Sequence, residues 1–231
     1  MRDFKFKRHD LVFLTPEGCT DAISLGPYPM ESHMAEGSLL CWCMSGHPLI
    51  VSRQSDHLPD THLQVGLAEP YSWGKRRLAF SVPRQEIARH ECPPDLAEVI
   101  QKLKLADAAL WQSLDRSFTA LGLTLRVFGS AALQSLTGLQ CMHADSDLDL
   151  LVQPETRDQA DAALTVMSSF VRQNPQLRLD GEILNPAGQG ASIREWLKRP
   201  DTLLVKSIDR VELLAQAEFN AAFSEMGVHA A

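Results

Sequence analysis

Two aspartates, Asp147 and Asp149, are separated by one residue and lead into the apolar run Leu150-Leu151-Val152. Residues two apart on a β-strand share a face, so the two carboxylates are expected to project together, about 6–7 Å apart along the backbone. Side chains at that separation can converge on divalent ions about 3.5–4 Å apart, the spacing used in two-metal displacement at phosphorus. The alternative is a solvated strand start, but two carboxylates beside a core strand are costly unless a cation or water compensates them.

A glycine-serine turn, Gly129-Ser130, follows the apolar segment Leu123 to Phe128 and precedes a short helix predicted for residues 131–136. Backbone amides at a helix N-terminus are unpaired and carry partial positive charge. A turn without a Cβ at Gly129 and with a hydroxyl at Ser130 can therefore cradle phosphate oxygens. Taken alone, the same pair is also compatible with an ordinary turn.

A third acid is available on the alternating segment Leu177 to Leu184, where Asp180 and Glu182 are expected to lie on one face. An acid on a strand beside the aspartate pair could join a metal cluster and accept the proton of an attacking hydroxyl. The residues leave open which of the two acids does so. Lys206, at the end of a predicted last strand, could neutralise phosphate charge or could be an ordinary surface lysine.

Periodicity in the second half of the chain predicts an α+β arrangement around these residues. A capping box of Asp95 and Glu98 predicts one long amphipathic helix that ends at Gly122. The other expected elements are strands at 123–128, 147–152, 177–184 and 202–205, and helices at 131–136, 156–171, 192–197 and 208–223. Thr156, with Gln159 at N3, is expected to open the helix at 156–171, and Ser207 is expected to cap the last one.

The first half is predicted to be a small β-rich domain, residues 1–92, followed by a catalytic domain, residues 93–231. Short extended runs separated by turn formers are expected at 11–14, 39–44, 49–51, 63–67 and 78–82, with a loop over residues 19–37. The basic cluster Lys75-Arg76-Arg77 could meet an acidic partner or phosphates. It could equally be the solvated tip of a hairpin.

The net charge of −7 is concentrated after residue 94, where 12 basic residues face 18 acidic ones. This balance argues against a nucleic-acid partner and is compatible with carboxylates that await cations. No apolar run is long enough to span a membrane, and the N-terminal residues lack the pattern of a secretory signal, so a cytoplasmic location is expected. The five scattered cysteines are expected to be reduced.

The constellation of an apolar-Gly-Ser turn, Asp-x-Asp on a strand and an acid on a later strand is similar to the signature of the polymerase-beta-like nucleotidyltransferase superfamily. The wider sequence resembles the phosphoribosyl-dephospho-CoA transferases, the holo-acyl-carrier-protein synthases of malonate decarboxylase. The segments that carry this resemblance are 8–11, 128–139, 146–151, 179–183 and 204–206. The resemblance implies a nucleotidyltransferase-type mixed sheet flanked by helices, preceded by a β-rich N-terminal domain.

The resemblance also implies a reaction. The 2′-(5″-phosphoribosyl)-3′-dephospho-CoA group would pass from its triphosphate precursor, triphosphoribosyl-dephospho-CoA, to a serine of the acyl carrier subunit of malonate decarboxylase, with release of pyrophosphate. Asp147 and Asp149 would hold Mg²⁺ ions, and Gly129 and Ser130 would bind the pyrophosphate end. Asp180 is expected to complete the site, with Glu182 as its substitute and Lys206 near phosphate. The N-terminal domain is hypothesised to recognise the carrier protein or the pantetheine arm.

Two rival functions remain compatible with the sequence. One is a different nucleotidyltransferase on the same fold, for instance an enzyme that moves AMP to a small molecule or protein. The other is a non-catalytic interaction module, against which the three intact carboxylates argue because a purely structural role does not need them.

Overall fold

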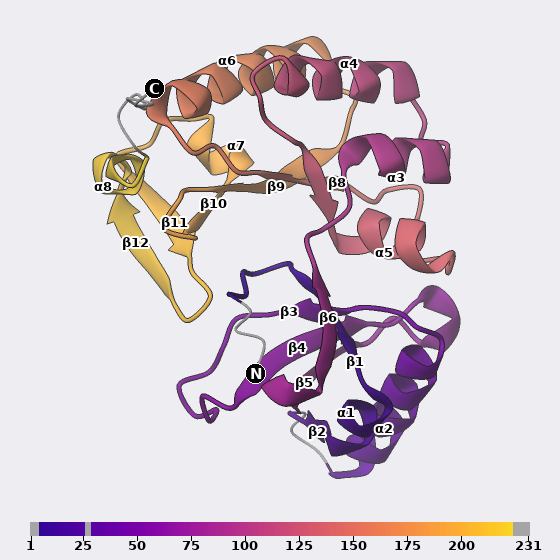
Figure 1. Ribbon diagram of the computed structural model, residues 1–231. Helices are drawn as coiled ribbons and strands as arrows, with labels where there is room; N and C mark the ends of the chain where they lie inside the picture. Colours follow the sequence, from indigo (N-terminus) through magenta and orange to yellow (C-terminus); the bar gives the residue numbers. More distant parts are fainter. Residues whose placement is uncertain (1–4, 26–28, 224–231) are drawn as a thin grey trace, which may run out of the picture. The chain divides into compact units, whose positions relative to one another are not determined.

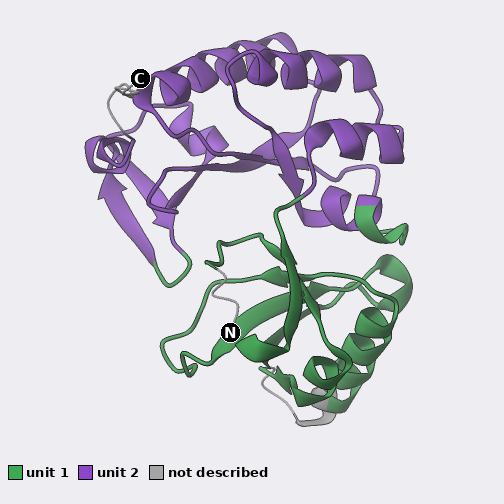
Figure 2. Cartoon of the chain, viewed as in Figure 1, with its two compact units in different colours: residues 1–93, 136–141, 208–210 green, residues 94–135, 142–207, 211–231 purple. Residues whose placement is uncertain are grey.

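The chain forms two compact units in a computed structural model that describes residues 5–25 and 29–223 (Figure 2). The first unit comprises residues 1–93 together with the short segments 136–141 and 208–210. The second unit comprises residues 94–135, 142–207 and 211–231. Each unit contains one six-stranded sheet.

The sheet of the first unit is antiparallel throughout, with the strand order β2-β5-β4-β3-β1-β6 (Figure 1). Its strands are β1 (Leu11–Leu14), β2 (Ile23–Ser24), β3 (Leu49–Val51), β4 (His62–Ala68), β5 (Arg77–Pro83) and β6 (Ile87–Glu91). Buried and partly exposed residues alternate along β4: Leu63, Val65 and Leu67 face the core, and the residues between them are partly exposed.

Two helices occupy much of the region for which a loop and an extended run were expected. They are α1 (Pro16–Asp21) and α2 (Pro29–Met44), and the short turns η1 (Tyr71–Trp73) and η2 (Arg84–Glu86) complete the unit. The extended run predicted at 39–44 is wrong because it belongs to α2, where Ala35, Leu39 and Trp42 are buried at helical spacing. Residues 26–28 of the predicted loop lie outside the described residues.

The sheet of the second unit is mixed, with the strand order β12-β11-β10-β9-β8-β7. Its strands are β7 (Arg126–Phe128), β8 (Leu148–Val152), β9 (Leu179–Leu184), β10 (Gly190–Ser192), β11 (Thr202–Lys206) and β12 (Val211–Ala215). Only β8 and β9 run parallel among the paired strands of the described residues. The helix α6 (Arg157–Gln173) provides the crossover between them, as a parallel connection requires.

Helices cover one face of this second sheet, and Figure 1 shows α4 (Ala108–Thr119) and α6 side by side on it. The buried core on this face joins Leu148 and Leu150 of β8 to Leu114 and Phe118 of α4 and Met167 of α6. The remaining helices are α3 (Leu96–Leu103), α5 (Gly129–Thr137), α7 (Ile193–Trp196) and α8 (Gln216–Ala221). Because the core takes the even-numbered residues of β8, Asp149 is left on the opposite face.

The single helix predicted after Pro94 is in fact two helices. Lys104 ends α3 with φ 48° and Asp107 precedes α4 with φ 56°, so both adopt the left-handed conformation that stops a helix. The predicted capping box is also wrong, because the Asp95 carboxylate caps no amide and instead pairs with Arg126 at 2.8 Å. The hydrophobic spacing continues through the break because the buried residues of α3 and α4 belong to the same core.

The predicted closing helix is wrong over its first half, where the chain forms β12 in place of a helix. Strand β12 pairs with β11 along its whole length, from Val211 opposite Lys206 to Ala215 opposite Thr202. Ser207, directly after β11, is buried and caps no helix, because none starts there. The helix α8 starts only at Gln216.

The fold class predicted from the sequence is confirmed as α+β, with a mixed sheet flanked by helices. No helix within the described ranges has the length and apolar character needed to cross a membrane.

Candidate active site

Asp149 and Asp180 occupy matched positions on the two parallel strands of the second unit. In the register of β8 and β9, Asp149 stands opposite Asp180, and on its other side Asp149 stands opposite Phe128 of β7. Neighbouring strands lie about 4.8 Å apart, and paired residues point to the same face. The two aspartates therefore share the sheet face that is not covered by the helical core.

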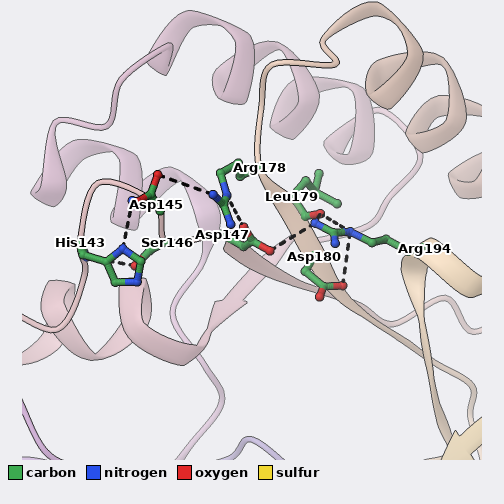
Figure 3. Close-up of polar contacts among 8 residues, drawn as sticks. All are labelled: His143, Asp145, Ser146, Asp147, Arg178, Leu179, Asp180 and Arg194. Carbon is green, nitrogen blue, oxygen red and sulfur yellow. Dashed lines mark hydrogen bonds and ion pairs between the residues drawn. The ribbon is translucent and has the colours of Figure 1, made fainter. Parts of the chain in front are cut away.

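Asp147 lies directly before β8, and its carboxylate is held by two arginines (Figure 3). Arg178 Nε donates to Asp147 Oδ1 at 2.7 Å, and Arg194 Nη2 donates to Asp147 Oδ2 at 3.2 Å. The hydrogen bond from Arg178, followed by the positive charges of both arginines, holds the pKa of Asp147 below its usual range. Asp147 is consequently an anion at neutral pH, a state required of a metal ligand.

The two arginines come from different elements and were not singled out by the sequence. Arg178 stands opposite the Asp147 position, immediately before β9, so strand alternation places it on the face of Asp180. Arg194 belongs to α7 and also donates to the carbonyl oxygen of Leu179 at 2.7 and 2.9 Å. Alternation could have found Arg178, whereas only the tertiary fold brings Arg194 to the same carboxylate.

Gly129 lies at the junction of β7 and α5, where its backbone has φ +69°. A Cβ at this position would stand 2.2 Å from Asp149 Oδ2, far inside van der Waals contact. The glycine is therefore needed twice, once for the left-handed turn and once for the space that the Asp149 carboxylate occupies. Ser130 follows in the first turn of α5 and is partly exposed.

Glu182 is buried and forms an ion pair with Lys206, whose Nζ is 3.2 Å from Glu182 Oε1. The pair joins β9 to β11 across the intervening β10. Gly190 of β10 makes this possible, because a Cβ there would be 2.9 Å from Glu182 Oε2. The two acids of the Asp-Gly-Glu segment thus have different surroundings: the Asp180 side chain is 41% exposed and that of Glu182 only 7%.

Gly181, between these acids, has φ +143°, and a Cβ on it would lie 1.9 Å from the carbonyl oxygen of Leu150. The backbones of β8 and β9 therefore approach each other at this residue as only glycine allows. This close approach accounts for a glycine between Asp180 and Glu182, which the sequence alone left unexplained.

The oxygen donors of Asp147, Asp149 and Asp180 suit a hard divalent cation such as Mg²⁺. In the part of the chain that the structure describes, however, no three His, Cys, Asp or Glu side chains are grouped to hold a metal ion. The orientation of Asp147 explains part of this, because its two oxygens are directed to arginines. The donors fit Mg²⁺ in their chemistry, and Asp147 would have to exchange its arginine contacts to serve.

The basic cluster at 75–77 proves to be heterogeneous. Arg76 forms a salt bridge at 2.6 Å with Glu69, whose side chain is fully buried, and donates to the Ser38 hydroxyl. Lys75 lies over the Tyr71 ring and donates to its hydroxyl at 2.7 Å, and Arg77 is exposed. Arg76 is therefore a structural residue of the first unit, and Lys75 and Arg77 remain candidates for contact with a partner.

Comparison with known proteins matches both halves of the chain to one family. The family models of the phosphoribosyl-dephospho-CoA transferase MdcG N-terminal domain and C-terminal domain match residues 7–93 and 95–217, respectively. No solved structure matches the chain significantly.

Curated relatives match over most of their length and carry the same description. A phosphoribosyl-dephospho-CoA transferase of Xanthomonas euvesicatoria pv. vesicatoria is 36% identical over 210 residues, which are 91% of this chain and 94% of the relative. Those of Bradyrhizobium diazoefficiens and Pseudomonas aeruginosa are 35% and 30% identical, covering 92% and 82% of this chain and 91% and 92% of the relatives. The chain therefore belongs to the phosphoribosyl-dephospho-CoA transferase family.

Proposed function

We propose that this protein transfers the 2′-(5″-phosphoribosyl)-3′-dephospho-CoA group from its triphosphate precursor to a serine of the malonate decarboxylase acyl carrier subunit. The observation that carries the proposal is the matched position of Asp149 and Asp180 on adjacent parallel strands, beside the Gly129 turn and Asp147. Family membership supports the transferred group. The acceptor, which is the carrier subunit, and the nucleotidyltransferase mechanism are proposed beyond what family membership supports.

The proposed reaction is an in-line displacement at the phosphorus that stays with the transferred group. The serine Oγ forms a bond to this phosphorus, the bond to the bridging oxygen of the pyrophosphate breaks, and the electron pair leaves with pyrophosphate. When bound at Asp147 and Asp149, Mg²⁺ supplies charge neutralisation for the triphosphate. Gly129 and Ser130 bind the pyrophosphate end through the amides at the start of α5.

Asp180 is proposed to take the proton from the serine hydroxyl. Its exposed carboxylate, in register with Asp149, has the access that a general base requires. Glu182 is a weaker candidate because it is buried and its carboxylate is already paired with Lys206. In this proposal Glu182 positions Lys206, and Lys206 meets a phosphate oxygen.

The deciding experiment incubates the full chain with apo carrier subunit, the triphosphate precursor and Mg²⁺, and then measures the mass of the carrier subunit. A gain equal to the transferred group is expected. Asp147→Asn, Asp149→Asn and Asp180→Asn should each abolish the gain, since a neutral amide can neither hold the cation nor accept the proton. Asp161→Asn, an exposed residue of α6, serves as the matched control and should retain full activity.

Two outcomes would overturn the proposal. Transfer of AMP from ATP to an acceptor, with no mass gain from the precursor, would assign the site to a different nucleotidyltransferase. Full activity of Asp149→Asn would remove the carboxylate pair from the chemistry. A selective loss in Glu182→Gln, with Asp180→Asn active, would exchange the roles proposed for these two acids.

A further inference from the structure

The two arginines on Asp147 form a cluster that the proposed reaction does not yet use. Their guanidinium groups converge on one carboxylate at the end of the sheet that carries Asp180 (Figure 3). Both side chains are more than half exposed, at 56% for Arg178 and 55% for Arg194, while that of Asp147 is 25% exposed. An exposed contact of this kind contributes little to stability, so its main consequence is to place two positive charges beside the site.

Each arginine has a further anchor that does not depend on Asp147. Arg194 keeps two hydrogen bonds to the Leu179 carbonyl and lies 3.9 Å from Asp180 Oδ1. Arg178 lies 3.7 Å from Asp145 Oδ1. If Asp147 turned away, both guanidinium groups would remain beside the site and each would gain unused donors.

We infer that Arg178 and Arg194 receive the pyrophosphate end of the substrate, and that Asp147 holds them in place until it exchanges them for the cation. The inference rests on the proposed function and adds two residues to its triphosphate site. A guanidinium group binds phosphate through paired N–H donors in the same way as it binds a carboxylate. One carboxylate cannot satisfy both arginines and a divalent ion, so binding of the cation and binding of pyrophosphate become linked.

Removing the arginines should change the two affinities in opposite directions, which a merely structural role would not produce. Without the arginines, the Asp147 charge is no longer neutralised, so affinity for a divalent ion alone should rise. Affinity for pyrophosphate should fall, because its donors are missing. A structural role predicts instead that both affinities fall together or that neither changes.

The test measures binding in the absence of turnover. Mn²⁺ affinity is measured by electron paramagnetic resonance, and pyrophosphate affinity by calorimetry in the presence of saturating Mn²⁺. We expect Arg178→Ala/Arg194→Ala to bind Mn²⁺ several-fold more tightly and pyrophosphate about tenfold more weakly, as for the loss of charge-assisted hydrogen bonds. Arg157→Ala, which removes an exposed arginine paired with Asp161 on α6, should change neither.

Substitution by lysine keeps the positive charge but removes the paired donors. Arg178→Lys/Arg194→Lys should therefore leave Mn²⁺ affinity near that of the parent chain while still weakening pyrophosphate binding, and it provides the measurement if the alanine variant does not fold. Parallel loss of both affinities in the folded variants, or unchanged values in both, would overturn the inference.

The outcome is separable from that of the proposed function. Asp147→Asn should lose Mn²⁺ affinity. If it does while Arg178→Ala/Arg194→Ala binds Mn²⁺ no more tightly than the parent chain, only the exchange is refuted. If Asp147→Asn binds Mn²⁺ as well as the parent chain does, the metal assignment within the proposed function fails first.

Discussion

Asp149 owes its place to a neighbouring glycine. The backbone at residue 129 is left-handed, and a Cβ there would lie 2.2 Å from Asp149 Oδ2, so both the conformation and the space oppose a larger residue. Because the conflicting atom is the end of a flexible side chain, a larger residue at 129 would displace the carboxylate more readily than it would unfold the chain. The glycine of the Gly-Ser turn is thus tied to the aspartate as well as to phosphate.

Gly129→Ala should therefore abolish transfer while destabilising the fold only modestly. The control is Gly138→Ala, since Gly138 has nearly the same backbone, with φ +71°, but a Cβ there would meet no neighbour within 4 Å. Both variants should lose about 1–2 kcal/mol of stability from the left-handed backbone, measured by urea unfolding. Only Gly129→Ala should lose the carrier mass gain, and comparable activity in the two variants would contradict the coupling to Asp149.

At the scale of elements, an ion pair between Glu69 and Arg76 links the end of β4 to the start of β5. Arg76 reaches the buried Glu69 across the turn between these strands, which includes η1. Burial would by itself raise the pKa of the Glu69 carboxyl, but the hydrogen bonds from Arg76 and Ser38 and the Arg76 charge together hold the pKa below its usual range. The pair therefore stabilises the folded state while Glu69 is ionised.

Stability should depend on pH through this pair. The folded pKa of Glu69 is lower than the unfolded value of about 4.3, so the contribution is complete above that pH and is lost as the pH falls through the folded pKa. Arg76→Ala leaves a buried carboxylate unpaired and should cost about 3 kcal/mol at pH 7. Protonation of Glu69 relieves that cost, so the difference from the parent chain should shrink toward pH 4.

Urea unfolding at pH 7 and pH 4 measures both values. Arg77→Ala, the exposed neighbouring arginine, is the matched control and should change stability by no more than about 0.5 kcal/mol at either pH. A destabilisation by Arg76→Ala that did not vary with pH would show that Glu69 is not the group that responds.

Over the whole molecule, each compact unit has its own sheet, and the units are not simply the two halves of the sequence. The first unit incorporates residues 136–141 and 208–210, and Tyr71 donates its backbone amide to the Gln140 carbonyl at 3.0 Å. The carboxylates proposed for catalysis all belong to the second unit. Recognition of the carrier subunit by the first unit, with its boundary at residue 92, stays a proposal.

The exposed cations of the first unit allow this proposal to be tested without disturbing the Glu69 pair. Lys75→Glu/Arg77→Glu should raise the KM for the carrier subunit several-fold, because carrier proteins tend to be acidic, and should leave kcat unchanged. Lys102→Glu/Arg172→Glu, on exposed sites of α3 and α6, makes the same charge change in the second unit. Equal effects on KM from the two pairs would attribute the change to net charge and remove the first unit from carrier recognition.

The sequence by itself determined the strands around Asp149 and Asp180, since period-two alternation and local turn residues act over a few positions. It also determined the capping box of α6, with Thr156 and Gln159 bonded as predicted. The local pattern wrongly predicted a strand at 39–44 and a helix at 208–215, because the conformation of a short apolar run depends on what it packs against. Residues 39–44 are buried as part of the helix α2, and β12 forms by pairing with β11.

Only the tertiary structure decided which charged groups meet. Arg194 comes to Asp147 over 47 residues of sequence, Lys206 comes to Glu182 over 24, and Gly190 opens the space between this last pair. Such contacts depend on strand order and on the distance between backbones, which no local pattern encodes. The sequence supplied the carboxylates, and the fold assigned their partners.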